Sequence, residues 1–316
     1  MTSHRPARRQ VVIGVDGGAT TTEIVVAGLD GGWIAQHQVG CTNHEVVGLE
    51  AATAELGGGI ATALERADAD AADVAASAFG LAGVDWASDE PRLGAAVSAF
   101  GLGGRRLVVN DALVALRAGS RRPWGIVSCV GTATVTAGVG RDGRRARTMA
   151  VGWGEPSGAS SLVRDALHAI AAAHHRTAPT TALAGAFLAA TALADVEALF
   201  EAITRGGLRV GPSFAPLVRE VCDAGDVVAR QLLERSGRDH AAMVVGVADR
   251  LDLRGADVEV VTSGGVHASG GPFAAAFADH LREHCPQASL APLQRPPVAG
   301  AVTLALELLD PIDTGC

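Results

Sequence analysis

The chain contains the same strand-and-turn segment twice. Residues 11–36, VVIGVDGGATTTEIVVAGLDGGWIAQ, read as an apolar strand, a Gly/Thr turn, a second strand, an Asp-Gly turn and a third strand. Residues 125–150, GIVSCVGTATVTAGVGRDGRRARTMA, repeat this order. The two Gly/Thr turns lie about 113 residues apart, and a repeat of this length indicates two related domains.

Helix and strand patterns alternate outside these segments. Helical periodicity covers 46–67 and 89–100, and apolar strands are expected at 74–83 and 105–111. The chain then reads as mostly helical over 158–254, with a strand at 258–262 and a last apolar helix at 298–309. We therefore predict an α/β fold of two duplicated domains with a cleft between them. The predicted domains are 10–119 with a returning helix at 298–316, and 120–297, after a disordered tail at 1–9.

Composition excludes several classes of function. The 26 basic residues are all arginine, whereas a Walker A loop, a protein kinase and a pyridoxal enzyme each need a lysine. The net charge of −8 argues against nucleic acid as a partner. The five cysteines form no CxxC pair, so we expect buried, reduced thiols. Because neither a signal-peptide pattern nor a sustained apolar span occurs, we expect a cytoplasmic protein that does not contact a membrane.

The Gly/Thr turns are candidate phosphate-binding loops. Asp16 ends an apolar strand and is followed by two glycines and three threonines, so backbone N–H groups can converge on an anion. A carboxylate at that place suits Mg²⁺, which prefers oxygen ligands and retains water molecules. An ordinary Gly-rich hairpin is the alternative for one turn, but two such turns can hold one nucleotide tail from both sides of a cleft. The residues predicted to contact ATP here are Gly17, Gly18, Thr20, Thr21, Gly131 and Thr132.

Asp111 is the candidate catalytic base. It ends the strand RRLVVND, and ligands of α/β domains bind at the carboxyl ends of strands. Phosphoryl transfer needs a group that accepts the proton of the acceptor hydroxyl. The structural alternative is that Asp111 is the N-cap of the next helix, a duty that Asn110 could share.

Two further segments follow the third strand of each repeat. Asn43 offers a donor and an acceptor, and Trp153 between two glycines offers a flat apolar face that suits a sugar ring. The alternatives are a core aromatic at Trp153 and a hydrogen-bonded structural histidine at His44, to which we assign no catalysis. Gly264 and Gly265 end a strand before a helix, where backbone can approach a nucleotide.

These segments together resemble a known family. VDGGATTTE, TNH, NDA, VGTAT, GWG, TSGGV and PPVAGAV occur in the order typical of N-acetylglucosamine kinases of the BadF/BadG/BcrA/BcrD ATPase family, within the actin, Hsp70 and sugar-kinase superfamily. The resemblance implies two actin-like (ribonuclease H-like) domains that close on ATP, Mg²⁺ and an amino sugar. It implies that Asp16 serves the metal and that Asp111 deprotonates the C6 hydroxyl. It also implies sugar contacts from Asn43, Asp111, Gly152, Trp153 and Gly154, and adenosine contacts from Gly264, Gly265 and Ser269.

The chain departs from the family pattern after Gly154. The family's usual Gly-Asp-Glu-Gly-Ser is replaced here by EPSGASS. Either Glu155 supplies the missing sugar contact, or the acceptor is another sugar, such as glucosamine or another hexosamine. Ala133 stands where the family often has glycine, which a turn tolerates if φ stays negative.

Two other activities are alternatives to a sugar kinase. One is an ATPase activator of an acyl-CoA dehydratase or reductase, which needs cluster-binding cysteines. The other is a sugar or nucleotide sensor without turnover. A homodimer is compatible with the resemblance.

Overall fold

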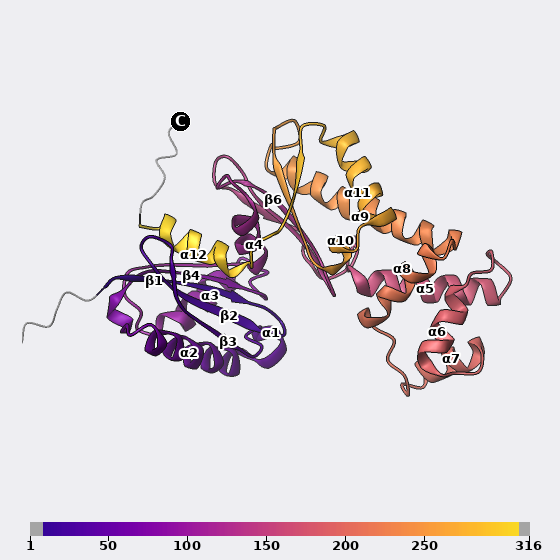
Figure 1. The fold of residues 1–316 in the computed structure, drawn as a ribbon, viewed down its shortest axis with the longest axis horizontal. Helices are drawn as coiled ribbons and strands as arrows, with labels where there is room; N and C mark the ends of the chain where they lie inside the picture. Colours follow the sequence, from indigo (N-terminus) through magenta and orange to yellow (C-terminus); the bar gives the residue numbers. More distant parts are fainter. Residues whose placement is uncertain (1–8, 310–316) are drawn as a thin grey trace, which may run out of the picture.

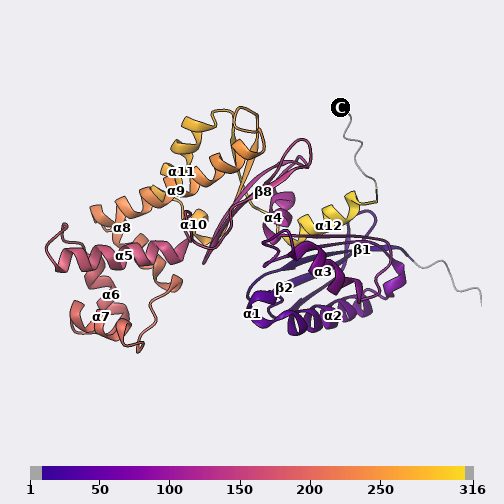
Figure 2. The same cartoon turned by 180° about the vertical axis from the view of Figure 1, so that it is seen from behind.

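Two five-stranded sheets organise the protein. The structure is a computed structural model that describes residues 9–309. Most of the predicted tail and the end of the predicted segment 298–316 therefore lie outside the described residues. The two sheets with their helices form two lobes side by side, and α4 and α12 lie between them (Figure 1, and Figure 2 from behind).

The first sheet has the order β3-β2-β1-β4-β5. Its strands are β1 (Val11–Gly17), β2 (Thr22–Gly28), β3 (Trp33–Val39), β4 (Val74–Leu81) and β5 (Arg105–Val109). β1, β2 and β3 form the predicted antiparallel meander, and β4 and β5 continue parallel to β1.

The second sheet repeats this arrangement with the order β10-β9-β6-β7-β8. Its strands are β6 (Gly125–Val130), β7 (Thr134–Val139), β8 (Arg145–Arg147), β9 (Glu259–Ser263) and β10 (Ser289–Pro292). The meander β6-β7-β8 is antiparallel, and β9 and β10 continue parallel to β6. The shared topology confirms the predicted duplication, although the short, largely exposed β10 has no clear sequence signal.

Helices cover the sheets. In the first lobe they are α1 (His44–Val47), α2 (Leu49–Arg66), α3 (Asp89–Ser98) and α4 (Asp111–Gly119). In the second they are α5 (Ala159–His174), α6 (Leu183–Thr191), α7 (Val196–Thr204), α8 (Ala215–Asp223), α9 (Val227–Arg250), α10 (Gly265–Ala268) and α11 (Gly271–His284), and α12 (Val298–Glu307) follows. Single 3₁₀ turns lie at Ala71–Asp73 and Pro212–Phe214.

The helix predicted from residue 46 is in fact two helices. Asn43 caps α1, and Gly48, with φ +84°, ends it before α2 begins. The positive φ suits glycine, so the chain can change direction here between α1 and α2.

The core of the first lobe explains why β1 is apolar at nearly every position. Alternate residues of a strand point to opposite faces. Ile13 and Val15 pack with α2 and α3, whereas Val12 packs with residues of α12, including Val302. Because both faces of β1 are covered, the strand lacks the alternating polar residues of a half-exposed sheet.

The helices α4 and α12 cross between the two sheets. Val114 of α4 and Ala301 of α12 belong to one apolar cluster with Val127 and Val261 of the second sheet. A Cβ atom on Gly300 would lie 1.9 Å from the carbonyl oxygen of Val114, so the two helices approach as closely as glycine allows.

The length and hydrophobicity of the helices can be compared with what a membrane span requires. In the part of the chain from 9 to 309, no single helix is long and apolar enough to cross a membrane, and α6 and α7 reach that length only as a pair bent by 60°.

Candidate active site between the two sheets

The first Gly/Thr turn closes the hairpin between β1 and β2. Asp16 is the last residue but one of β1, and the N–H group of Gly18 donates to the oxygen of Thr21 at 3.0 Å. Residues 19–21 are exposed, so their backbone and hydroxyl groups face outward from the end of the sheet. This is the geometry expected of a loop that can receive an anion.

Asp111 is the first residue of α4, two residues after the end of β5. The side chain of Asn110 accepts from the N–H group of Ala112 at 3.0 Å, which makes Asn110 the N-cap. The carboxylate of Asp111 accepts from the same N–H group at 2.9 Å. The alternative role of Asp111 as the N-cap is therefore wrong, and its carboxylate lies at the helix N-terminus, where negative charge is favoured.

One cavity brings the two halves of the site together. It has a volume of about 360 Å³ and opens between the ends of the two sheets. Five predicted residues line it from the first half: Asp16, Gly18, Thr20, Thr21 and Asp111. The second half contributes Cys129 and Val135 of β6 and β7 and Ser263 of β9. Since duplicated elements face each other here, the cavity is the predicted cleft.

The cavity is an unfavourable place for negative charge. Burial, with further contributions from Asp111 and Glu23, raises the pKa of Asp16 to about 7. Burial also raises the pKa of Asp111 to about 6, although the N–H group of Ala112 opposes this shift. Loss of solvent around the Cys129 thiol, with further contributions from Asp111 and Asp16, raises its pKa to about 12. A cation bound between the carboxylates would relieve this repulsion, so the residues present fit a metal ion.

The second Gly/Thr turn is held from two sides. The N–H groups of Ala159 and Ser160, at the start of α5, donate to the oxygens of Gly131 and Thr132 at 2.9 and 3.3 Å. Ala133 is not among the residues with positive φ, as expected for a residue that replaces glycine.

A buried histidine fixes the end of this turn. His240 of α9 donates from Nδ1 to the oxygen of Ser236 at 2.7 Å, so its Nε2 atom accepts from the hydroxyl of Thr134 at 3.0 Å. Burial lowers the pKa of His240 to about 4, which keeps the ring neutral and able to accept. Sequence reasoning missed this contact, because a histidine in a helical pattern gives no sign of its partner.

Gly264 connects the second turn to β9. Its φ is +96°, and a Cβ atom there would lie 2.3 Å from the oxygen of Val130. Only glycine permits this approach, which brings the end of β9 against the turn that begins at Gly131. Gly265 starts α10, and the hydroxyl of Ser269 donates to the oxygen of Val266 at 2.7 Å. Neither lines the cavity of Asp16 and Asp111.

Asn43 and His44 lie beside Gly83 in the first lobe, and neither lines the cavity of Asp16 and Asp111. The side-chain oxygen of Asn43 accepts from the N–H group of Glu45 at 2.9 Å, so it is already engaged as a cap. A Cβ atom on Gly83 would lie 2.7 Å from this oxygen and 3.0 Å from Nδ1 of His44. That Nδ1 atom is buried without a hydrogen-bond partner, so the expectation of a hydrogen-bonded structural histidine is wrong for this nitrogen.

Asp85 links the two lobes and was not predicted. Its Oδ1 atom accepts from the Nδ2 atom of Asn110 at 3.0 Å and pairs with the guanidinium of Arg147 in β8 at 3.2 Å. Its charge also contributes to the raised pKa of Asp111. Asp85 follows β4, so the rule that selected Asp111 at the carboxyl end of a parallel strand would have found it too.

The segment after β8 forms a protruding loop. Trp153 is 81% exposed, so the alternative of a core aromatic is wrong. The carboxylate of Glu155 accepts from the N–H groups of Val151 and Gly152 at 2.7 and 3.2 Å and so holds the loop. Gly154 and Glu155 line a separate hollow of about 300 Å³ between α5 and α9. The loop therefore does not join the cavity of Asp16 and Asp111.

The cysteines are free and dispersed. In the described part of the chain, Cys222 and Cys285 are buried, whereas Cys41 and Cys129 are partly exposed, which corrects the expectation of burial for these two. Cys316 lies outside the described residues. The cluster of three or more metal-ligating side chains found within 9–309 contains no cysteine.

Comparison with known proteins places this site in context. One relative, an N-acetylmuramic acid/N-acetylglucosamine kinase from Clostridium acetobutylicum, is 27% identical over 301 residues, covering 93% of this chain and 97% of the relative. Another, an N-acetyl-D-glucosamine kinase from Dictyostelium discoideum, is 26% identical over 315 residues, covering 94% and 98%.

A solved structure shows the same fold. A candidate N-acetylglucosamine kinase from Chromobacterium violaceum superposes with a TM-score of 0.70 at 22% identity, covering 94% of this chain and 99% of that one. The predicted fold class, two actin-like α/β domains, is confirmed. The model of the BadF/BadG/BcrA/BcrD ATPase family matches residues 13–306. The duplicated sheets, the paired Gly/Thr turns and this nearly complete match together show that the chain belongs to the BadF/BadG/BcrA/BcrD ATPase family.

Proposed function

We propose that the protein is an ATP-dependent kinase that phosphorylates the C6 hydroxyl of an amino sugar, with N-acetylglucosamine as the first acceptor to test. The observation that carries the proposal is the shared cavity: Asp16, Asp111 and the first Gly/Thr turn face elements of the second sheet across it. The names of both curated relatives support an N-acetylated amino sugar as the acceptor.

Asp111 acts as the general base in this proposal. Its carboxylate accepts the proton of the sugar hydroxyl while the oxygen attacks the γ-phosphorus of ATP. The O6–Pγ bond forms, the bond from Pγ to the β-bridging oxygen breaks, and ADP leaves. The raised pKa of about 6 keeps Asp111 mostly ionised at neutral pH yet closer to the working range than an ordinary aspartate.

The two Gly/Thr turns bind the phosphates from opposite sides. Exposed backbone at 19–21 and at Thr132 provides N–H groups, and Gly264 brings the end of β9 beside the second turn. Asp16 is the residue that would hold Mg²⁺, which when bound neutralises charge on the β- and γ-phosphates. A cytoplasmic location is part of the proposal, because ATP is available there.

The loop at 152–154 completes the acceptor site in the proposal. Trp153 projects its apolar ring into solvent with Gly152 and Gly154 on either side, so lobe closure can place the ring against a sugar. Asn43 contributes its free Nδ2 donor, because its oxygen already caps α1.

A panel of acceptors tests the proposal. We expect ADP release that depends on N-acetylglucosamine, with N-acetylmuramic acid, glucosamine and glucose as comparisons, and a 6-phosphate identified by ³¹P and ¹H NMR. Sugar binding without ADP release would contradict a kinase and favour a sensor. Failure of all four sugars to bind or react would contradict the sugar assignment.

A pair of variants tests the base. Asp111→Asn should lower kcat by about 10²–10⁴-fold with ATP affinity nearly unchanged, because the amide cannot accept the proton. Asp30→Asn is the matched control, since Asp30 lies in the exposed turn between β2 and β3 and its amide can still accept from Gly32. If Asp111→Asn keeps most of the wild-type rate, Asp111 is not the base.

A further inference from the structure

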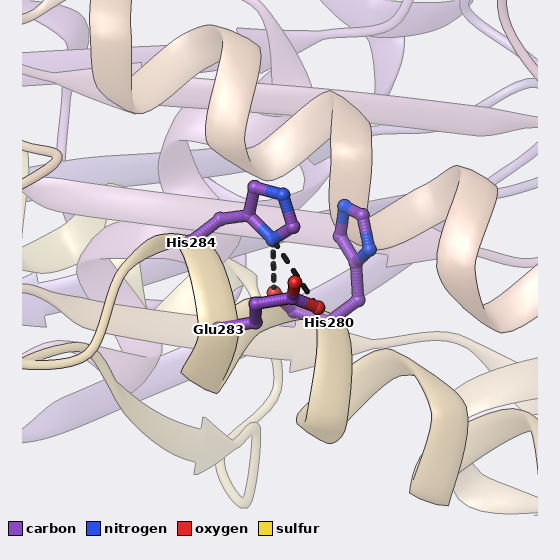
Figure 3. Close-up of side chains that lie close together, drawn as sticks. All are labelled: His280, Glu283 and His284. Atoms are coloured by element: carbon purple, nitrogen blue, oxygen red, sulfur yellow. Dashed lines mark hydrogen bonds and ion pairs between the residues drawn. The ribbon is translucent and has the colours of Figure 1, made fainter.

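A cluster of metal-ligating side chains lies at the end of α11, away from the cavity of Asp16 and Asp111. It consists of His280, Glu283 and His284, whose side chains gather on one part of the helix (Figure 3). None of the three lines the ATP cavity, and the proposed kinase reaction does not use them. The group therefore needs a separate explanation.

The spacing suits chelation by one helix. Residues four apart lie on the same face of a helix, and two histidines so placed can share one Zn²⁺. The rings of His280 and His284 stack with centroids 4.2 Å apart and an interplanar angle of 21°. One ligand atom from each of the three side chains lies within 4.8 Å of the others. Zn–N distances of about 2.0–2.1 Å need ligand atoms about 3.4 Å apart, so small side-chain rotations suffice.

The backbone fixes the orientation of one ring. The Nδ1 atom of His284 donates to the carbonyl oxygen of His280 at 3.0 Å, which leaves Nε2 with a free lone pair. The carboxylate of Glu283 lies 4.0 Å from the same Nδ1 atom, so a negative charge is available to balance a cation. Backbone and carboxylate partners of this kind set ring orientation in zinc sites.

The surroundings leave room for an ion and its water. A hollow of about 730 Å³ between α8, α9 and α11 reaches His280 and Glu283. Arg238 lines the same hollow, and two other arginines near the cluster are partnered: Arg282 with Asp279 at 2.7 Å and Arg254 with Asp249 at 3.2 Å. Their charges are thus partly neutralised and oppose a bound cation less.

We propose that His280, Glu283 and His284 form a binding site for one divalent transition-metal ion, of which Zn²⁺ is the ion to test. Two imidazoles and a carboxylate suit Zn²⁺, whereas Mg²⁺ prefers oxygen ligands alone. The site is therefore distinct in ligand chemistry from the Mg²⁺ site proposed at Asp16. A bound ion would tie together the last turn of α11, just before the chain leads into β10.

Binding of Zn²⁺ to the full-length, tag-free protein tests the proposal. After removal of metals with a chelator, calorimetric titration without ATP or sugar should give one Zn²⁺ per chain and a raised Tm. His284→Ala and His280→Ala should each weaken binding at least about tenfold and remove the Tm shift. His174→Ala is the matched control, because its neighbour His175 is adjacent rather than four residues away.

The outcomes separate this site from the kinase reaction. If His280→Ala and His284→Ala bind Zn²⁺ as the wild type does, or if the wild type binds none at about 100 μM Zn²⁺, the proposal is wrong. Circular dichroism of each variant without metal verifies folding, so a loss of binding is not a loss of structure. Glu283→Gln, which removes only the charge, should weaken binding less than either alanine variant.

Discussion

The buried carboxylate of Asp16 is predicted to cost the protein stability, and the cost should depend on pH. Its pKa of about 7 in the folded protein compares with 3.8 for an ordinary aspartate. A shift of about 3 units at 1.36 kcal/mol each gives an upper figure of about 4 kcal/mol above pH 7. Solvent in the open cavity screens part of this, so about half is expected.

The sign follows from which state ionises first. Below pH 4 the carboxyl is protonated in both states and costs nothing. Between pH 4 and pH 7 the unfolded chain loses the proton while the folded protein keeps it, so stability falls as pH rises. Asp16→Asn abolishes this titration. Its stability relative to wild type should therefore increase by about 1–2 kcal/mol between pH 5 and pH 8.

Urea unfolding without Mg²⁺ or nucleotide, at several pH values from 5 to 8, measures this difference. Any constant effect of the amide cancels, because the prediction concerns only the change with pH. Glu220→Gln, at an exposed position on α8, is the control and should show no such trend. A gap between Asp16→Asn and wild type that stays constant over this range would refute the argument that burial raises the pKa of Asp16.

Three further predictions concern the base, the helix crossing and the acceptor loop. The value of kcat/KM should fall about tenfold between its plateau and pH 5, because a base with a pKa of about 6 is then mostly protonated. Asp85→Asn should shift this decrease to lower pH, because it removes a charge that raises the pKa of Asp111. Gly300→Ala should lower the free energy of unfolding by about 1–3 kcal/mol, because the added methyl group clashes with α4. Gly246→Ala is the control: open space surrounds Gly246 on α9, so the free energy of unfolding should rise by about 1 kcal/mol in the same urea titrations. Trp153→Ala should raise KM for the sugar about tenfold and leave KM for ATP unchanged in steady-state assays, since its exposed ring is proposed to meet only the acceptor.

Local patterns were enough to predict the framework of the fold. The apolar strands and the repeated Gly/Thr and Asp-Gly turns predicted both meanders, because these signals lie within about 25 residues and depend on backbone geometry alone. The break at Gly48 was not predicted, since a single glycine inside an apolar helical pattern has several structural meanings. The strand β10 was missed because four largely exposed residues carry too little pattern to separate from a loop.

The candidate site was predictable where it follows the ends of strands. Asp16 is the last residue but one of β1, Asp111 follows the end of β5, and both line the cavity. The contacts of Asp85 with Asn110 and Arg147 were not predictable, because they join residues from different strands and, for Arg147, from different lobes. Pairing across such distances depends on how the lobes pack, which local sequence does not encode.

The two copies of the repeated strand end carry different side chains on the two sides of the cavity. Asp16 is the last residue but one of β1, and Cys129 is the last residue but one of β6. Each lies two residues before a glycine of its turn, and both side chains line the cavity. The thiol, whose pKa is about 12, stays neutral where a second aspartate would add a third carboxylate to the cavity. The charge of Asp111 already contributes to the raised pKa of Asp16, so another carboxylate would further favour the protonated form of the groups proposed to bind the metal and accept the proton. In this chain the strand end of the second sheet therefore carries a neutral thiol where the first sheet carries a carboxylate. Phosphate binding, which uses backbone N–H groups, can stay on both sides.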